Sequence, residues 1–434
     1  MTLRLTVREA IGSLPPGSDA RGLLFEWDGR LFRAFGGDSA SMFERLLAAA
    51  WLPELFDAGL VRFERADVVL EDHSLVVEVE RVPVVSYPAE WPVVMLRDAG
   101  LMMARLGASL ARHGLGFHDA HPWNVLYDGP RPVFVDLGSI IESGEVSLTW
   151  AREFRLDIVL PLALHRLGLH ELAGAIAGTE HARWKSGLDR RRFRAFPPAY
   201  ALLGRHRSDP ARYYAMLADH VAGLSDRGAK TASSDDALDT PEVGEVERYS
   251  QKQQSMDQLL SEIPPGRLLD VGANAGWYSL LAAEHGHAVT AIDVDDGALR
   301  ALYLQARARG RPVLPLKMDF MRPTGSSGLG LACPAAPQRL RSGTVMALAT
   351  VHRLVGRQGA TLEQFAWVLD MFAADRAIVE FIPRNDSDVA SWPLATESWY
   401  DAAALVSAMA PYFRLVKTMP SSPAPRTILL FARA

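Results

Sequence analysis

The carboxylates and glycines between residues 267 and 294 could bind a nucleoside. The segment RLLDVGANAG breaks an apolar run at Gly272, Asn274 and Gly276, and the segment AVTAIDV reaches Asp293 at the end of another. Glycines let the backbone approach a ligand where a Cβ would collide, and a following helix offers unpaired N–H groups. A carboxylate about twenty residues after the first glycine can accept hydrogen bonds from both ribose hydroxyls. The pattern predicts a nucleoside site at the ends of two strands.

Asp270 and the spacing of the turn indicate the charge of the ligand. Dinucleotide sites use G-x-G-x-x-G, so that a pyrophosphate can lie on the helix N-terminus. Here the glycines are spaced differently, and Asp270 puts a carboxylate beneath the turn. That carboxylate repels phosphate and favours a cationic ligand, one that bears an ammonium and a sulfonium. The two motifs resemble those of class I S-adenosylmethionine (SAM) methyltransferases, D-x-G-x-x-x-G and an acidic residue at the end of the second strand.

This resemblance covers roughly residues 249–434 and implies a Rossmann-like, seven-stranded α/β domain with SAM as its cofactor. By the resemblance, Asp319 contacts the adenine amine and Phe320 lies on the adenine face. The cofactor-binding residues it implies are Asp270, Gly272, Asn274, Gly276, Trp277, Asp293, Val294, Asp319 and Phe320.

Two further residues are candidates for the chemistry itself. Methyl transfer requires a nucleophile aligned with the sulfonium methyl group and, for an acidic nucleophile, a base. His352 follows the predicted fourth strand and titrates near neutrality, so it is a candidate base, with a structural role at the strand end as the alternative. Glu380 lies in an apolar strand and should bind a cationic substrate nitrogen or pair with Arg353 or Arg384. Convergence of Glu380 with Glu397 would favour an amino or guanidino acceptor.

The elements that position these residues alternate between strand and helix. Such alternation predicts a parallel sheet with helices on both faces and ligands at the carboxyl ends of its strands. Residues 413–419 and 427–432 have no helix between them and should form an antiparallel pair that closes the sheet. The predicted strands are Leu268–Val271, Ala288–Val294, Val313–Met318, Thr344–Thr350 and Ala377–Ile382, and the predicted helices are Trp277–Glu284, Gly297–Arg309, Leu362–Phe372 and Ser398–Met409.

A second constellation of polar residues lies between residues 118 and 138. His118-Asp119 is followed by Asn124, and a predicted strand leads into the segment Asp136-Leu137-Gly138. This order resembles the catalytic core of protein kinases and aminoglycoside-type phosphotransferases. By the resemblance, Asp119 would be the base, and Asn124 and Asp136 would be magnesium ligands if the site is active.

The first half departs from the kinase pattern where the nucleotide should be held. The first lysine of the chain is Lys185, after the catalytic loop, so Arg33 takes the place of the lysine that anchors ATP, with Glu44 as its expected partner. The segment Glu26-Trp27-Asp28-Gly29 offers one glycine where the family uses three. A degenerate kinase-like scaffold, a working phosphotransferase and a coincidental likeness are the three interpretations.

Composition and polar segments predict the domain organisation. The chain has 434 residues, of which 49% are hydrophobic, and therefore room for two or three domains. The stretch SDRGAKTASSDDALDTPEVGE is poor in large apolar residues and is the best candidate for a linker. We expect an α+β kinase-like domain at residues 1–225, a linker at 226–245 and the methyltransferase domain at 246–434.

Charge, hydropathy and cysteine content exclude several classes of partner. The net charge is −5 and no basic block stands out, so a nucleic-acid partner is not implied. No apolar run approaches the ~18 residues of a membrane span. The single cysteine, Cys333, fits a reducing cytoplasm. We expect a cytoplasmic protein that acts on a small-molecule substrate and could form a homodimer.

The sequence therefore predicts a SAM-dependent methyltransferase that acts on a nitrogen or oxygen of a small polar metabolite and carries a degenerate kinase-like domain. One alternative is a bifunctional enzyme that also phosphorylates through the first half. Another is a non-enzymatic protein that binds and senses SAM. The combination of the two halves is similar to enzymes of bacterial specialised metabolism, which implies a role in natural product biosynthesis.

Overall fold

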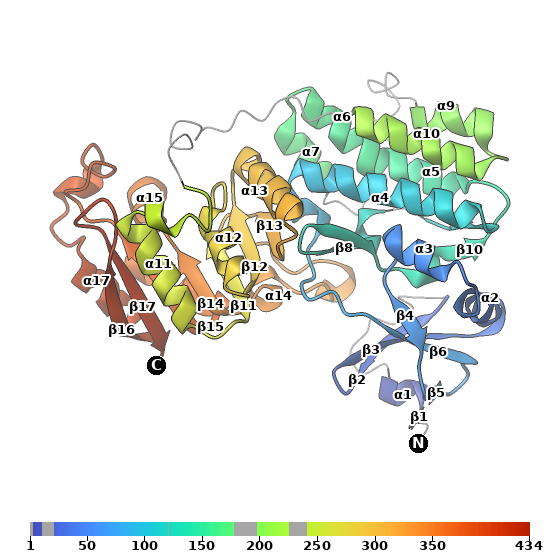
Figure 1. Ribbon diagram of the computed structural model, residues 1–434, viewed down its shortest axis with the longest axis horizontal. Coiled ribbons are helices and arrows are strands. Elements are labelled where there is room, and N and C mark those ends of the chain that lie inside the picture. The colour runs from blue at the N-terminus through green and yellow to red at the C-terminus, as the bar shows by residue number, and fades with distance from the viewer. Residues whose placement is uncertain (1–2, 11–20, 120, 178–197, 225–240) are drawn as a thin grey trace. The chain divides into compact units, whose positions relative to one another are not determined.

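The chain folds into two compact units. The computed structural model describes residues 3–10, 21–119, 121–177, 198–224 and 241–434 (Figure 1). The first unit is Met1–Gly228 with Gly328–Ala332, and the second is Ala229–Ser327 with Cys333–Ala434. Most of the predicted linker, 226–245, lies outside the described residues.

The first unit contains a four-stranded antiparallel sheet with the strand order β2-β3-β6-β4. The turn between β2 and β3 is made by Asp28 and Gly29, which both have positive φ. Such a two-residue turn matches the twist of the hairpin strands. The strands of this sheet are β2 (Leu23–Trp27), β3 (Arg30–Phe35), β4 (Phe63–Arg65) and β6 (Leu75–Val79).

Helices make up most of the rest of the first unit. Three two-stranded sheets accompany them, β1 (Leu3–Leu5) with β5 (Val68–Leu70), β7 (Leu115–Phe117) with β10 (Ile140–Glu142), and β8 (Val125–Asp128) with β9 (Arg131–Phe134). The helices described in this unit are α1 (Val7–Ala10), α2 (Gly37–Leu47), α3 (Leu52–Asp57), α4 (Val93–Ala111), α5 (Leu148–Phe154), α6 (Leu160–Arg166), α7 (His170–Ala177), α9 (Pro198–His206) and α10 (Pro210–Gly223).

The second unit is built on a seven-stranded sheet with the strand order β13-β12-β11-β14-β15-β17-β16. The first five strands in this order are parallel, and β17 runs antiparallel to both of its neighbours. The predicted C-terminal antiparallel pair is confirmed. The strands are β11 (Arg267–Val271), β12 (Ala288–Asp293), β13 (Val313–Lys317), β14 (Ser342–Ala347), β15 (Ala373–Phe381), β16 (Phe413–Pro420) and β17 (Thr427–Arg433).

The helices of the second unit differ from the prediction in several respects, and the short helix α14 was not predicted. A helix that was not predicted, α15, follows β14. Helix α17 begins at Ala402 rather than Ser398, because the Asp401 side chain caps it by accepting a hydrogen bond from the Ala404 N–H (2.7 Å). The helices are α11 (Gln251–Glu262), α12 (Trp277–Glu284), α13 (Asp296–Arg309), α14 (Ala336–Arg339), α15 (Val351–Gln358), α16 (Leu362–Phe372) and α17 (Ala402–Met409).

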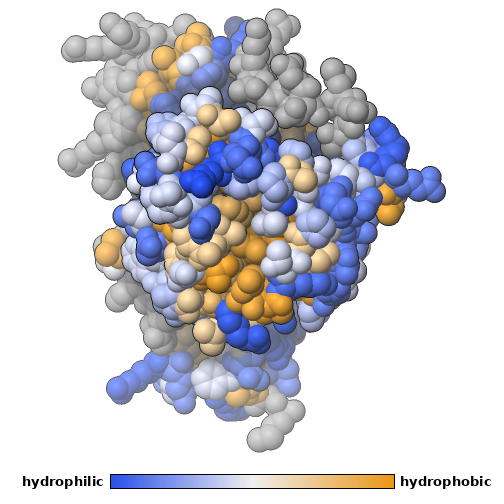
Figure 2. Space-filling view, turned by 90° about the vertical axis from the view of Figure 1, so that its left-hand side faces the viewer, coloured by the Kyte–Doolittle hydropathy of each residue, from blue (hydrophilic) through white to orange (hydrophobic). Residues whose placement is uncertain are grey.

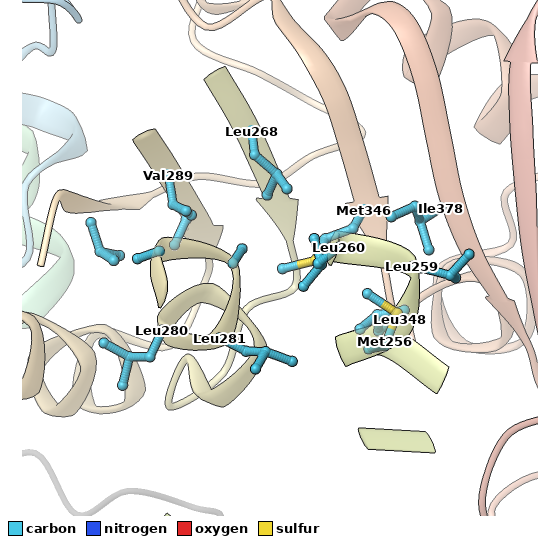
Figure 3. Packing of buried hydrophobic residues seen from close by; sticks show 14 of the residues in the cluster. Met256, Leu259, Leu260, Leu268, Leu280, Leu281, Val289, Met346, Leu348 and Ile378 are labelled. Atoms are coloured by element: carbon cyan, nitrogen blue, oxygen red, sulfur yellow. The ribbon is translucent and has the colours of Figure 1, made fainter. Parts of the chain in front are cut away.

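One apolar cluster joins the sheet of the second unit to α11 and α12 (Figure 3). Met256 and Leu260 of α11 pack with Met346 of β14, and Leu281 of α12 belongs to the same cluster as Leu268 of β11. All five side chains are almost completely buried. Because burial of each such side chain stabilises the fold by roughly 1.5–3 kcal/mol, this cluster fixes the strand ends that follow.

Apolar residues also gather on one face of the molecule, with hydrophilic residues around them (Figure 2). Strand β16 lies at the edge of the sheet, and two of its large apolar side chains, Leu415 and Val416, are exposed. In the described part of the chain, every helix is too short or too polar to cross a membrane.

Candidate functional site

A cavity of about 670 Å³ lies in the second unit, where β11, β12, β13 and β14 end. It is lined by residues that follow these strands and by side chains of α11, α12 and α15. Seven of the nine residues predicted to bind the cofactor are among them, Asp270, Gly272, Asn274, Asp293, Val294, Asp319 and Phe320. The structure therefore brings both sequence motifs together in one site.

The turn after β11 requires glycine at two positions. Gly272 and Gly276 have φ of +71° and +78°, a region that disfavours residues with a Cβ. A Cβ at Gly272 would lie 2.8 Å from the Thr350 hydroxyl oxygen, and one at Gly276 would lie 2.2 Å from a methyl carbon of Leu302. Glycine at position 272 therefore avoids a collision with Thr350, another residue that lines the cavity. Gly276 does not line the cavity, and its contact is with α13.

Asp270 lies beneath the turn in a position with little access to water. Its carboxyl group accepts a hydrogen bond from the Ser279 hydroxyl (2.5 Å). Burial raises the pKa of Asp270 to about 7, although the Ser279 hydrogen bond and the nearby Lys252 oppose this shift. The prediction of a fixed negative charge is therefore modified, because near neutral pH the protein populates both forms of this group. A cation bound over it would favour the ionised form.

Asp293 and Asp319 are held by the backbone that follows their strands. Asp293 accepts hydrogen bonds from the N–H groups of Asn274 (2.8 Å) and Asp295 (3.0 Å), one at each carboxylate oxygen. Asp319 accepts one from the Met321 N–H (2.9 Å). Each carboxylate oxygen has a further lone pair and can still accept a hydrogen bond from a ligand.

Val294 and Phe320 are two of the apolar residues that line the cavity. Val294 follows β12 and is 60% exposed, whereas Phe320 is buried against Phe365 and Phe372. Trp277, which the sequence placed in the same set, does not line the cavity. Its indole N–H donates a hydrogen bond to the Pro241 carbonyl oxygen (2.7 Å) instead.

Glu380 is completely buried and is held by three groups rather than by a ligand. Its carboxylate pairs with the Lys252 ammonium (2.7 Å) and accepts hydrogen bonds from the Ala349 N–H (2.9 Å) and the Ser421 hydroxyl (2.5 Å). The expected partners Arg353 and Arg384 are therefore incorrect. Sequence reasoning also missed Lys252, a cavity-lining residue, because it lies 128 positions from Glu380.

The expected convergence of two carboxylates is not found. Neither Glu380 nor Glu397 lines the cavity. Glu397 accepts a hydrogen bond from the Trp399 indole N–H (2.7 Å). The charge of Glu380 is compensated by Lys252, so neither acid is placed to bind a cationic acceptor.

His352 is turned away from the cavity by the phase of α15. It is buried, its ring stacks on Trp392 (centroids 5.4 Å apart), and it does not line the cavity. Burial, followed by the nearby Arg353, lowers the pKa of His352 to about 4. Other residues of α15, Arg353, Arg357 and Gln358, contribute to the cavity wall.

The polar residues of the first unit form a separate constellation. Asp119 accepts hydrogen bonds from the Asn124 amide (3.0 Å) and the Ser139 hydroxyl (2.7 Å). Asp136 forms an ion pair with the buried Arg33 guanidinium (2.9 Å). Burial lowers the pKa of Arg33, and Asp136 opposes that shift.

Arg33 does not pair with Glu44, contrary to the prediction. Glu44 forms its ion pair with Arg65 instead, on the exposed surface. Arg33 therefore takes the place of the expected lysine but holds the Asp136 carboxylate directly. In the described part of the chain, no group of His, Cys, Asp and Glu is arranged to hold a metal ion.

Comparison with known proteins gives relatives for the whole chain and for part of it. No family model matches. The chain is 26% identical over 467 residues to the nodulation protein NoeA of Rhizobium meliloti (strain 1021), an alignment that covers 96% of this chain and 95% of NoeA.

Two solved structures are similar to less than half of the chain. Magnesium protoporphyrin IX methyltransferase (ChlM) from Synechocystis PCC 6803 with bound SAH is 16% identical over 42% of this chain and 83% of that chain, with a TM-score of 0.31. The bifunctional kinase-methyltransferase WbdD is 15% identical over 42% of this chain and 39% of that chain, with a TM-score of 0.32.

Proposed function

We propose that the second unit is a SAM-dependent methyltransferase that acts on a nitrogen or oxygen of a small polar metabolite. The observation that carries this proposal is the convergence of Asp270, the turn at Gly272 and Asp293 on one cavity at the carboxyl ends of parallel strands. Ligands of open α/β sheets bind at this edge. Asp270, whose pKa is about 7, is a better partner for a ligand that carries positive charge than for one that carries phosphate.

The cavity offers a partner for each part of SAM. Asp293 would accept hydrogen bonds from the ribose hydroxyls, and Asp319 would accept one from the adenine amine. Val294 and Phe320 provide apolar surface for the adenine ring. Asp270 lies beneath the turn and in its ionised form would stabilise the positive charge of the methionyl part.

In the transfer step, the main role of the protein is to align the acceptor atom with the methyl group. Bound SAM would supply a methyl group on a positively charged sulfur, to which a lone pair of the acceptor would bond while the carbon–sulfur electron pair stayed on sulfur. A neutral amine can attack without prior loss of a proton and then release its proton to water. Because His352 is buried outside the cavity, we assign it a packing role beside Trp392.

We propose that the first unit is a kinase-like scaffold without phosphotransferase activity. The supporting observation is the Arg33–Asp136 ion pair, which occupies the carboxylate that a magnesium ion would need. A bifunctional enzyme with an active phosphotransferase is the alternative. The similarity to a nodulation protein along nearly the whole chain supports a role in bacterial specialised metabolism.

Substitution of Asp293 by alanine tests the cofactor site. We expect Asp293→Ala to weaken binding of S-adenosylhomocysteine (SAH) by roughly tenfold to a hundredfold, because the ribose hydroxyls lose a charged acceptor. The affinity is measured by calorimetric titration. Asp375→Ala is the matched control, since Asp375 is an exposed aspartate near the start of β15, outside the cavity. Unchanged affinity of Asp293→Ala would contradict the assignment, as would equal losses in both variants.

A measurement of turnover distinguishes a methyltransferase from a protein that only senses SAM. A sensor would bind SAH and release no methylated product. An enzyme transfers the labelled methyl group of SAM to an acceptor.

A further inference from the structure

The charged side chains of the cavity come from different elements. Carboxylates come from the ends of β11 and β12 and from the segment after β13, and each accepts the hydrogen bonds described above. On α15, by contrast, the charged residues that line the cavity are Arg353 and Arg357, and Gln358 adds an amide. This arginine pair is the feature of the cavity that cofactor binding does not explain.

The arginine pair has no acidic partner within the described part of the chain. Neither guanidinium lies within ion-pair distance of a described carboxylate, whereas Arg426, farther along the same unit, pairs with both Asp386 and Asp388. Arg357 instead contacts a neutral aromatic ring, since its guanidinium lies 4.3 Å from the centre of the Trp392 ring.

The pair is exposed on α15, and its position favours a bound anion. Residues four apart lie on the same face of a helix, and two like charges there repel each other. Arg353 also lies in the first turn, where the helix dipole is positive, and this turn contains no acidic residue. An oxyanion between the two side chains would relieve both repulsions and could accept paired hydrogen bonds from each guanidinium.

We infer that the acceptor carries an oxyanion, a carboxylate or a phosphate, which Arg353 and Arg357 bind. This inference rests on the proposed methyltransferase function and names the class of its substrate. The oxyanion fixes the acceptor on α15, and a separate nitrogen or oxygen of the same molecule attacks the methyl carbon. The new carbon–nitrogen or carbon–oxygen bond replaces the carbon–sulfur bond, sulfur keeps that electron pair, and the proton of the attacking atom leaves to water.

The carboxylate of the cofactor itself is the main rival for the arginine pair. We assign it to Lys252, which comes from α11 and lines the cavity, because its ammonium donates one hydrogen bond to Glu380 (2.7 Å) and has two further protons to donate. Arg353, in contrast, acts on the buried His352. The methionyl part of the cofactor and the acceptor anion thus have different cationic partners.

The test uses the full-length protein, first titrated with SAH and then, when saturated, with malonate or inorganic phosphate. The variant is Arg353→Gln/Arg357→Gln, which keeps polar side chains and removes both charges. The matched control is Arg384→Gln, because Arg384 is an exposed arginine of the same unit that does not line the cavity. Agmatine serves as the cationic probe.

We expect at least one of the two anions to bind the SAH complex of the wild-type protein and of Arg384→Gln, and to bind the double variant about tenfold or more weakly. Preference for malonate or for phosphate distinguishes a carboxylate acceptor from a phosphorylated one. SAH affinity should change less than about twofold in the double variant.

Four outcomes would overturn the inference. They are the absence of saturable anion binding, equal anion binding by the double variant, binding of agmatine in place of the anions, and a tenfold loss of SAH affinity in the double variant, which would assign the arginines to the cofactor carboxylate. In all four cases SAH binding by the wild-type protein would still support the proposed methyltransferase. Failure of the wild-type protein to bind SAH would remove both proposals together.

Discussion

Asp270→Asn is expected to lose SAH affinity by roughly 30-fold or more while it makes the protein without cofactor more stable. The two effects have one cause. Asp270 is buried, and its pKa is raised to about 7, so its ionised form is costly until a cation lies above it. Asparagine has nearly the same shape and carries no charge at any pH.

The sign of the pH dependence follows from the two pKa values of Asp270. The pKa rises from 3.8 to about 7 on folding, so between these values the folded state holds more protons than the unfolded state, and stability falls as the pH rises. The loss of stability that comes from ionising Asp270 in the folded state is absent below pH 3.8 and complete above about pH 7. Its upper limit is about 4 kcal/mol. The stability gain of Asp270→Asn should therefore grow from pH 5 to pH 8.

Two measurements check this expectation. Thermal unfolding at pH 5 and pH 8 should show a larger gain in melting temperature at pH 8 for Asp270→Asn. SAH titration of the wild-type protein should show affinity that rises with pH and levels off above the pKa of Asp270, whereas the variant should show a flat profile. A variant that binds SAH like the wild-type protein would remove Asp270 from the cofactor site.

Glu380→Ala is expected to destabilise the second unit by about 3 kcal/mol, the lower end of the range for breaking a buried ion pair. The carboxylate is completely buried, and its loss leaves the Lys252 ammonium, the Ala349 N–H and the Ser421 hydroxyl without their acceptor. The effect lies at the lower end because Lys252 lines the cavity and can take up water there.

A double-mutant comparison separates the charge from the shape of Glu380. Lys252→Met/Glu380→Leu removes both charges and should recover much of the melting temperature that Glu380→Ala loses. Glu380→Gln keeps hydrogen-bonding capacity without the charge, and its melting temperature should lie between those of Glu380→Ala and the double variant. If Glu380→Ala unfolds at the temperature of the wild-type protein, the ion pair does not hold α11 to the sheet.

The cofactor motifs could be predicted from the sequence because their signals are local. An apolar strand, a glycine turn and an acidic strand end lie within 27 residues of one another, from Arg267 to Asp293, and parallel strands carry their ends to one edge. The structure places Asp270, Gly272 and Asp293 at that edge. Gly276 and Trp277 belong to the same segment but do not line the cavity. Gly276 packs against Leu302, and Trp277 donates a hydrogen bond to the Pro241 carbonyl oxygen.

The acceptor side of the cavity was predicted less well because a helix was overlooked. Val351, Leu354 and Val355 are spaced as the buried face of a helix, and this signal was present in the sequence. With α15 in place, His352 falls on the buried side and Arg353 on the cavity side.

The partners of buried charges could not be predicted from local patterns. Lys252 meets Glu380 across 128 positions, and Arg33 of β3 meets Asp136, which follows β9. Sequence reasoning recognised that Glu380 needs a partner, since a carboxylate in an apolar strand is costly alone. Which cation supplies it is decided by tertiary packing.

The central claim is tested most directly by calorimetric titration of the full-length protein with SAH, followed in the same cell by ATP with magnesium. We predict binding of SAH at one site with micromolar affinity and no saturable binding of magnesium-ATP. Binding of both ligands would favour the bifunctional enzyme and contradict the scaffold role of the first unit. Absence of SAH binding would contradict the account of the cavity built on Asp270, Gly272 and Asp293.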